Sequence, residues 1–225
     1  MCGRYTLTAE PALLEDRFAC RLSDVPYRTS YNIAPGQEVL AVVSADAELR
    51  AGLLRWGLVP SWAKDPKAGY RMINARAETA AEKPSFRRAL RQRRCLILAD
   101  GFYEWRREGR QKTPMYIRLR SGEPFAFAGL WERWHGPDGT PLVTCSILTT
   151  AANALMQPIH HRMPVILDRE AESLWLNSEI TEPQTLLPAL APIDAEVMDA
   201  YEVSSEVNSA RHNAPDCIVP VAGSC

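Results

Sequence analysis

The chain has 225 residues, of which 46% are hydrophobic and 24% charged, and its formal net charge is −1 at pH 7. This length and composition are typical of one globular domain, and they exclude a collagen, a coiled coil and an intrinsically disordered chain. The apolar runs are far shorter than the ~20 residues that cross a bilayer, and the first residues lack the charged-then-apolar pattern of a signal peptide. We therefore expect a cytoplasmic protein that does not contact a membrane.

The cysteines and arginines narrow the class of protein further. Six cysteines are scattered without a CxxC or CxxH pair, a pattern that favours a reducing compartment and argues against both a disulfide framework and a zinc site. All but four of the 26 basic residues are arginine. Arginine suits bidentate contacts to phosphate, but a GC-rich genome produces the same bias, so composition alone does not indicate nucleic acid.

A short helix is the first element that the sequence predicts. Thr8 is a candidate N-cap, and Leu14 and Phe18 recur four residues apart, so that they share one helix face. We expect this helix to run to about Cys20.

Strands and turns dominate the rest of the chain. Apolar and β-branched segments predict strands at 39–44, 49–56, 95–98, 115–119, 125–131, 142–149, 163–167 and 218–221. The polar turn 45–48 is predicted to pair the first two strands, and turns at 121–122 and 136–139 predict a meander over the central ones. Short helices are predicted at 84–94, 151–156 and 168–175, the last capped by Asp168.

Hairpins interrupted by short helices indicate the α+β class rather than a doubly wound fold. We expect a single domain over residues 1–225, built on a mostly antiparallel, barrel-like twisted sheet with short peripheral helices. No repeat, low-complexity tract or long linker divides the sequence.

Cys2 is the most suggestive position for chemistry. We hypothesise that the initiator methionine is removed, which gives Cys2 a free α-amine with a pKa near ~7.7 to 8.0 beside a thiol with a pKa of about 8.5. Such an amine condenses with an aldehyde, and the thiol then closes a five-membered thiazolidine on the imine carbon. Position alone leaves the alternative open that Cys2 is merely a small residue near a chain end.

Further segments point to one family. The segments are Met1-Cys2-Gly3-Arg4-Tyr5, 31–36 (YNIAPG), 56–62 (WGLVPSW), 73–79 (INARAET), 100–105 (DGFYEW), 159–164 (IHHRMP), Val203-Ser204 and Val207-Asn208. Together they resemble the SRAP family, whose members shield abasic sites in single-stranded DNA by covalent attachment through an N-terminal cysteine. The resemblance covers essentially the whole chain in the family's order.

The resemblance implies a role for four residues and no metal or organic cofactor. It makes Cys2 the covalent nucleophile, Asn74 a polar partner near the adduct, and Glu104 and His160 acid/base groups. Imine formation needs protons taken from the amine and given to the departing hydroxyl, which suits a carboxyl group and an imidazole. Without the family, Glu104 could be a solvent-facing strand residue, Asn74 a turn residue and His160 a structural histidine.

Three of these assigned residues have an arginine close by, and one of them, His160, also has a competitor. His161 competes with His160, and only register against the family pattern selects His160. Arg4, Arg76 and Arg162 each lie two residues from a proposed catalytic residue, where phosphates flanking an abasic nucleotide would be bound.

Further DNA contacts are predicted at Trp62 and Thr149. Trp62 is a candidate platform for a base next to the lesion, with core packing as the alternative, whereas Trp56 and Trp131 are expected in the core. Thr149 could bind a phosphate or cap the predicted helix after it.

The expected function is the covalent cross-linking of abasic sites in single-stranded DNA during the DNA damage response. We expect the protein to be a monomer and to lie at the nucleoid when it is bound to DNA. A thiol peptidase that uses Cys2 with Glu104 and His160 is the alternative reading, and autocatalytic removal of Met1 could connect the two activities. Lyase cleavage of the strand is a predicted side reaction, because an imine at C1′ acidifies the C2′ protons. A third class is a DNA-binding module without chemistry.

Overall fold

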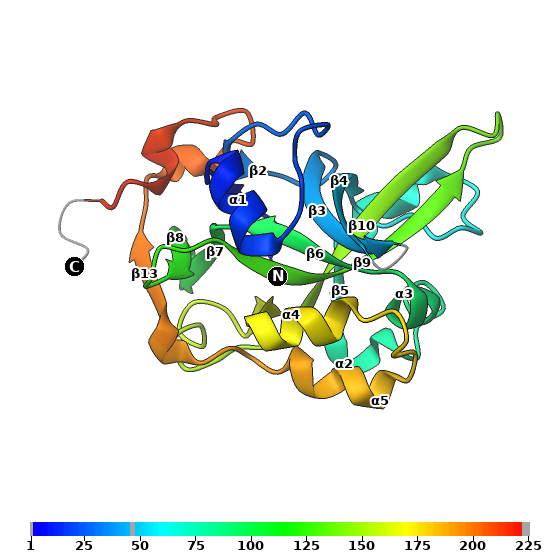
Figure 1. Cartoon of the computed structure of the whole chain (residues 1–225). Coiled ribbons are helices and arrows are strands. Elements are labelled where there is room, and N and C mark those ends of the chain that lie inside the picture. Colours follow the sequence, from blue (N-terminus) through cyan, green and yellow to red (C-terminus); the bar gives the residue numbers. More distant parts are fainter. Residues whose placement is uncertain (1, 46–47, 222–225) are drawn as a thin grey trace.

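A closed ring of strands forms the centre of the computed structural model, which describes residues 2–45 and 48–221 (Figure 1). The ring runs β10–β4–β3–β6–β9 and back to β10, and β10 meets β4 in parallel, whereas the other ring contacts are antiparallel. Its strands are β3 (Glu38–Ala45), β4 (Glu48–Trp56), β6 (Arg94–Ala99), β9 (Phe125–His135) and β10 (Pro141–Ala151). This arrangement confirms the α+β class and the mostly antiparallel, barrel-like sheet.

Short strands extend the ring, and a second sheet packs beside it. The extensions are β5 (Asn74–Arg76), β11 (Arg162–Pro164) and β12 (Ile166–Leu167). The second sheet has the order β13 (Met198–Glu202), β8 (Gln111–Leu119), β7 (Gly101–Glu108), β1 (Tyr5–Leu7) and β2 (Ser30–Ile33). The helices are α1 (Pro11–Phe18), α2 (Ala77–Ala80), α3 (Arg87–Gln92), α4 (Arg169–Leu176) and α5 (Pro183–Leu186). Short 3₁₀ helices lie at Pro66–Arg71, Leu187–Leu190, Ala195–Val197, Ser205–Asn208 and Pro215–Ile218.

Aromatic side chains join the two sheets. Tyr5 of β1 packs edge-on against Trp56 of β4 and Phe127 of β9, with ring centroids 5.3 and 5.6 Å apart. Phe102 of β7 meets the same Phe127 ring at 6.0 Å. Edge-to-face pairs of this kind contribute about 0.5 to 1.5 kcal/mol beyond their area burial. Tyr5 therefore fixes the N-terminal segment, and with it Cys2, at the junction of the two sheets.

Several sequence predictions agree closely with the structure. Strands β3 and β4 pair in register from Glu38 to Ala45, as predicted for 39–44 and 49–56, although the turn predicted at 45–48 includes residues 46–47, which lie outside the described residues. Asp168 caps α4 by accepting a hydrogen bond from the backbone N–H of Ala171. Leu14 and Phe18 are the buried residues of α1.

The predicted start and end of the first helix are wrong. The residue before α1 is Glu10, and the helix ends at Phe18 because Ala19 adopts a left-handed conformation with φ 47°. Thr8 is bound instead to Asp100, whose carboxylate also accepts the backbone N–H groups of Thr8 and Ala9. A long-range carboxylate thus replaces the local cap that the sequence suggested.

The predicted central meander is interrupted, because β8 and β9 belong to different sheets even though only a short turn separates them.

Residues 151–156 do not form the predicted helix: β10 continues to Ala151 and turns follow it. The helix predicted at 84–94 is shortened to α3, and the strand predicted at 163–167 is split into β11 and β12. At 218–221 a 3₁₀ helix ends and a single bridge, Val203 to Pro220, replaces the predicted strand.

Within the described residues, no helix is long and apolar enough to cross a membrane.

Candidate active site

Cys2 lies in the segment that leads into β1 and runs beside β7. Tyr5 pairs with Phe102, and the backbone N–H of Tyr103 donates to the carbonyl of Arg4 at 2.9 Å, so the chain before Tyr5 continues antiparallel towards Glu104. The Cys2 side chain is fully buried, and Glu104 is only 4% exposed. Burial and the nearby Glu104 carboxylate raise the pKa of the Cys2 thiol well above its usual range, although the Arg4 backbone N–H donates to the sulfur. The thiol is therefore protonated at neutral pH.

His160 faces the same carboxylate. Its Nδ1 lies 3.0 Å from the Arg162 backbone nitrogen and 3.1 Å from the Arg162 carbonyl oxygen, so Arg162 holds the ring through its backbone. Burial lowers the pKa of His160 below its ordinary value, and the charge of Glu104 partly opposes this shift. The imidazole is thus mainly neutral at pH 7 and able to accept a proton.

The two adjacent histidines are distinguished by the tertiary structure. His160 and Glu104 both line a pocket of about 450 Å³, together with Trp105, Arg107, Lys112 and Asn208. His161 is exposed, and its ring stacks on that of His160 with centroids 4.4 Å apart. His160 rather than His161 thus shares the pocket with Glu104.

Asn74 is held by the backbone around it. The Trp56 indole N–H donates to the Ile73 carbonyl at 2.8 Å, and Asn74 pairs with Ile147 as β5 joins β10. A close approach between Gly57 and Gly69 makes this path possible, since a Cβ on Gly69 would stand 2.4 Å from the Gly57 carbonyl oxygen.

Both polar atoms of the Asn74 amide are buried and make no hydrogen bond to any described residue. An amide left in this state costs free energy unless a ligand engages it. Glu104 acts electrostatically on both Cys2 and His160, whereas Asn74 has an amide with unused hydrogen-bonding capacity.

The three predicted arginines have different surroundings. Arg162 forms a two-pronged ion pair with Glu78, at 2.5 and 2.9 Å, and also donates to the Thr149 carbonyl at 2.5 Å. Arg76 is exposed and makes no ion pair or hydrogen bond with a described side chain. Arg4 is part-buried and bound within the protein, as described below.

Trp62 and Thr149, the other two predicted DNA contacts, differ in their exposure to solvent. Trp62 is 65% exposed, so the core-packing alternative for it is wrong, while Trp56, 1% exposed, is a core residue as predicted. Trp131 is half-buried and packs against the core. Thr149 is fully buried, and its hydroxyl lies 3.2 Å from an Arg162 nitrogen and 3.4 Å from the Ala75 carbonyl. It does not cap a helix, because none follows it.

Asn32 is a site residue to which the sequence analysis assigned no role. It is 1% exposed, and its side-chain oxygen accepts a hydrogen bond from the Arg4 guanidinium at 2.8 Å. Its NH₂ group donates to the carbonyls of Val207, Ser209 and His212. Asn32 thereby ties Arg4 to the C-terminal segment. It stands in a segment that carries the family resemblance, which was the one available signal.

The sequence analysis also assigned no role to Glu78, Trp105 and Asn208, although each belongs to a segment that carries the resemblance. Glu78 binds Arg162, and the Trp105 indole N–H donates to the Asn208 side chain at 2.7 Å. These roles depend on partners 84 and 103 positions away in the sequence, so no local pattern revealed them.

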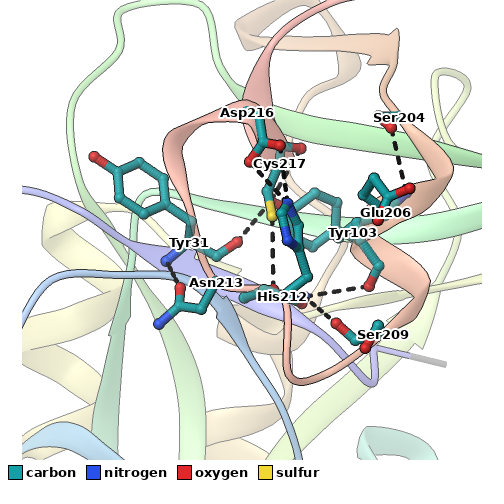
Figure 2. Close-up of polar contacts among 11 residues, drawn as sticks. Tyr31, Tyr103, Ser204, Glu206, Ser209, His212, Asn213, Asp216 and Cys217 are labelled. Carbon is teal, nitrogen blue, oxygen red and sulfur yellow. Dashed lines mark hydrogen bonds and ion pairs between the residues drawn. The ribbon is translucent and has the colours of Figure 1, made fainter.

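The C-terminal segment 203–218 is fastened to β2 and β7 by polar contacts (Figure 2). Asn213 accepts the Tyr31 backbone N–H at 2.7 Å, and the Tyr103 hydroxyl lies 2.7 Å from the Tyr31 carbonyl oxygen and 3.3 Å from the Cys217 carbonyl oxygen. The His212 ring nitrogen Nε2 lies 2.9 Å from the Asp216 carboxylate oxygens. These contacts hold the Val207 carbonyl where it accepts a second hydrogen bond from Arg4, at 2.8 Å.

One group of three potential metal ligands occurs among the described residues. The side-chain donor atoms of His212, Asp216 and Cys217 lie within 4.8 Å of one another. His212 and Asp216 satisfy each other by hydrogen bonding, and the Cys217 thiol contacts the His212 carbonyl at 3.8 Å. The prediction that the protein uses no metal stays a prediction.

We expect the Asn32→Ala variant to lose about 2 to 4 kcal/mol of unfolding free energy, because it removes one of the two acceptors of the Arg4 guanidinium and the buried donor of the Ser209 and His212 carbonyls. Urea unfolding measures this change. Ser30→Ala is the matched control, because Ser30 belongs to the same strand as Asn32 and makes only a long 3.3 Å contact with Asn213. This variant should change the unfolding free energy by less than about 0.5 kcal/mol. Equal stability of the two variants would contradict the role given to Asn32.

Comparison with known proteins first defines the fold. A crystal structure of a protein from Bacteroides thetaiotaomicron matches with a TM-score of 0.88 and 30% identity, and the match covers 98% of this chain and 100% of that one. A second, from Bordetella bronchiseptica, matches with a TM-score of 0.80 and 25% identity over 90% of this chain and 100% of that one.

Sequence comparison then identifies the family. Residues 1–210 match the profile described as SOS response associated peptidase (SRAP), and this chain belongs to that family. The abasic site processing protein YoqW of Bacillus subtilis is 52% identical over 97% of this chain and 99% of its own length. The abasic site processing protein HMCES of Gallus gallus is 34% identical over 98% of this chain and 78% of its own length. The resemblance inferred from the sequence is thus confirmed.

Proposed function

We propose that this protein processes abasic sites in DNA by forming a covalent thiazolidine cross-link through Cys2, in single-stranded DNA and as part of the response to DNA damage. Its relatives bear the name abasic site processing protein, which supports DNA as the partner. The observation that carries the proposal is the placement of Glu104, which acts electrostatically on both Cys2 and His160 and lines a pocket with the latter.

The reaction follows from these groups. After removal of Met1, the α-amine of Cys2 attacks the C1′ aldehyde of the open-ring abasic sugar, and the hydroxyl leaves as water to give an imine. The Cys2 sulfur then adds to the imine carbon, and its proton passes to the nitrogen, which closes the thiazolidine ring. Glu104 and His160 supply and accept the protons, and the Asn74 amide, whose two buried polar atoms have no partner among the described residues, hydrogen-bonds a sugar oxygen.

The proposed chemistry and the peptidase alternative differ in which group of Cys2 attacks first. A thiol peptidase attacks with the sulfur, and the Cys2 thiol is buried beside a carboxylate, which raises its pKa. In the proposed reaction the amine attacks first, and the thiol is needed only for ring closure. We propose that the protein acts as a single-domain monomer in the cytoplasm, with Arg4, Arg76, Arg162, Trp62 and Thr149 on the DNA side of the site and no cofactor.

The test is denaturing electrophoresis of the protein incubated with a single-stranded oligonucleotide that carries one abasic site. Mass spectrometry first verifies that Met1 is absent. We expect a heat-stable shifted band with the abasic oligonucleotide and none with intact DNA. If processed protein gives no shift, the cross-linking function is wrong, and the peptidase or the simple binding module becomes the better explanation.

A further inference from the structure

Two cations line the pocket beside Glu104 and His160 without any role in the mechanism above. Arg107 of β7 and Lys112 of β8 stand directly opposite each other in the antiparallel register, near the tip of the β7–β8 hairpin. Directly paired residues project from the same face of a two-stranded ribbon. Both side chains are exposed, so both charges are accessible from the pocket.

This pairing costs the free protein stability. Like charges directly opposite each other on a sheet repel, and neither Arg107 nor Lys112 forms an ion pair or a hydrogen bond with a described side chain. Arg106, on the other face of the same strand, is by contrast paired with Glu108 at 2.8 Å and lies 3.7 Å from Glu202. An anion between Arg107 and Lys112 would remove the repulsion.

The wall next to these cations is already rigid. The Trp105 indole is fixed by its 2.7 Å hydrogen bond to Asn208, and the Arg4 guanidinium lies over its ring, 6.0 Å from the centroid. The lining of the pocket of about 450 Å³ therefore includes an ordered aromatic side chain and two cations that form no ion pair with a described side chain. Such a combination suits a phosphodiester with its attached sugar.

We propose that Arg107 and Lys112 bind a backbone phosphate of the DNA strand adjacent to the abasic nucleotide. This inference rests on the proposed function, since it places a phosphate beside the residues that receive the abasic sugar. Arg76, the exposed arginine without an ion pair among the described residues, belongs to the barrel sheet, whereas Arg107 and Lys112 belong to the second sheet, and the reacting groups lie where the two sheets meet. The DNA strand thus has a phosphate contact on each of the two sheets, one on either side of the abasic nucleotide.

The test compares the wild-type protein with the double variant Arg107→Gln/Lys112→Gln. The probes are single-stranded oligonucleotides with an unreactive tetrahydrofuran abasic analogue at one end, extended either only 5′ or only 3′ of the analogue. We expect the double variant to lose about tenfold in affinity for one of the two probes, to keep its affinity for the other, and to show a salt-dependence slope smaller by about one. Arg110→Gln, which removes a charge from the same hairpin outside the pocket, is the matched control.

Two further readouts exclude a purely structural effect. The thermal midpoint of the free double variant should equal or exceed that of the wild type, because the cross-strand repulsion is gone. The cross-linking rate at saturating DNA should stay within about twofold of the wild-type rate, since neither residue touches the reacting atoms.

An equal loss for both probes, a loss no larger than that of Arg110→Gln, or a lower thermal midpoint would overturn the proposal. Its failure can be told from failure of the proposed function. If the wild type cross-links abasic DNA while the double variant binds both probes normally, only the phosphate site is wrong. If the wild type forms no cross-link, the proposed function itself is wrong.

Discussion

The Cys2→Ala variant is expected to form at least about 100-fold less heat-stable cross-link than the wild type, because ring closure needs the thiol. The alanine variant still exposes an α-amine after removal of Met1, so it should form an imine that borohydride reduction traps, and it should nick some of the DNA by β-elimination. Denaturing electrophoresis with and without borohydride separates these products.

The control for this variant is another buried cysteine. Cys20 is 5% exposed and lies outside the site, so Cys20→Ala should cross-link at the wild-type rate. Replacing Cys225, whose thiol lies outside the described residues, prevents unrelated disulfide dimers. Unchanged cross-linking by Cys2→Ala, or the absence of both nicking and a reducible imine, would contradict the mechanism.

The Glu104→Gln variant is expected to cross-link about 10²-fold more slowly, which is the lower end of the contribution of a positioned acid/base group. It should also alter the titration of His160. The carboxylate raises the pKa of His160 against the lowering effect of burial, so its removal lowers that pKa further. Because a lower pKa keeps the imidazole neutral to lower pH, any acidic loss of rate that comes from His160 should move to lower pH.

NMR titration of the histidine ring measures this pKa directly, and single-turnover cross-linking across the pH range measures its effect on rate. Glu108→Gln is the matched control, because Glu108 is an exposed residue of the same strand that pairs with Arg106. A His160 pKa that rises or stays constant in Glu104→Gln would show that the two groups do not interact as described.

Long-range contacts account for most of the differences between prediction and structure. The Thr8 cap failed because Asp100, far along the chain, offers a charged acceptor to three donors at once, which a neutral local hydroxyl does not match. The central meander failed because a turn dictates a change of direction but not the partner strand, and β8 and β9 bury their apolar faces in different sheets.

In the candidate site, too, local motifs predicted some features, and long-range contacts determined the others. Cys2, Asn74, Glu104 and His160 were each predicted from motifs, but the ion pair of Arg162 with Glu78 and the burial of Thr149 were not. In the free protein Arg162 is thus bound to a carboxylate rather than left open to a phosphate. The ion pair of Arg162 depends on the packing of α2, which carries Glu78, next to β11, which carries Arg162. Neither segment by itself encodes this packing.

The sequence by itself determined the fold class, the strands of the barrel and the family, because alternating apolar residues and ordered motifs are local properties of the chain. Only the tertiary structure placed His160 in the pocket with Glu104, exposed the Trp62 side chain, buried the Cys2 thiol beside Glu104 and set Arg107 opposite Lys112. These features arise where separate strands meet, and burial and charge at such a junction depend on neighbours that are distant in the sequence.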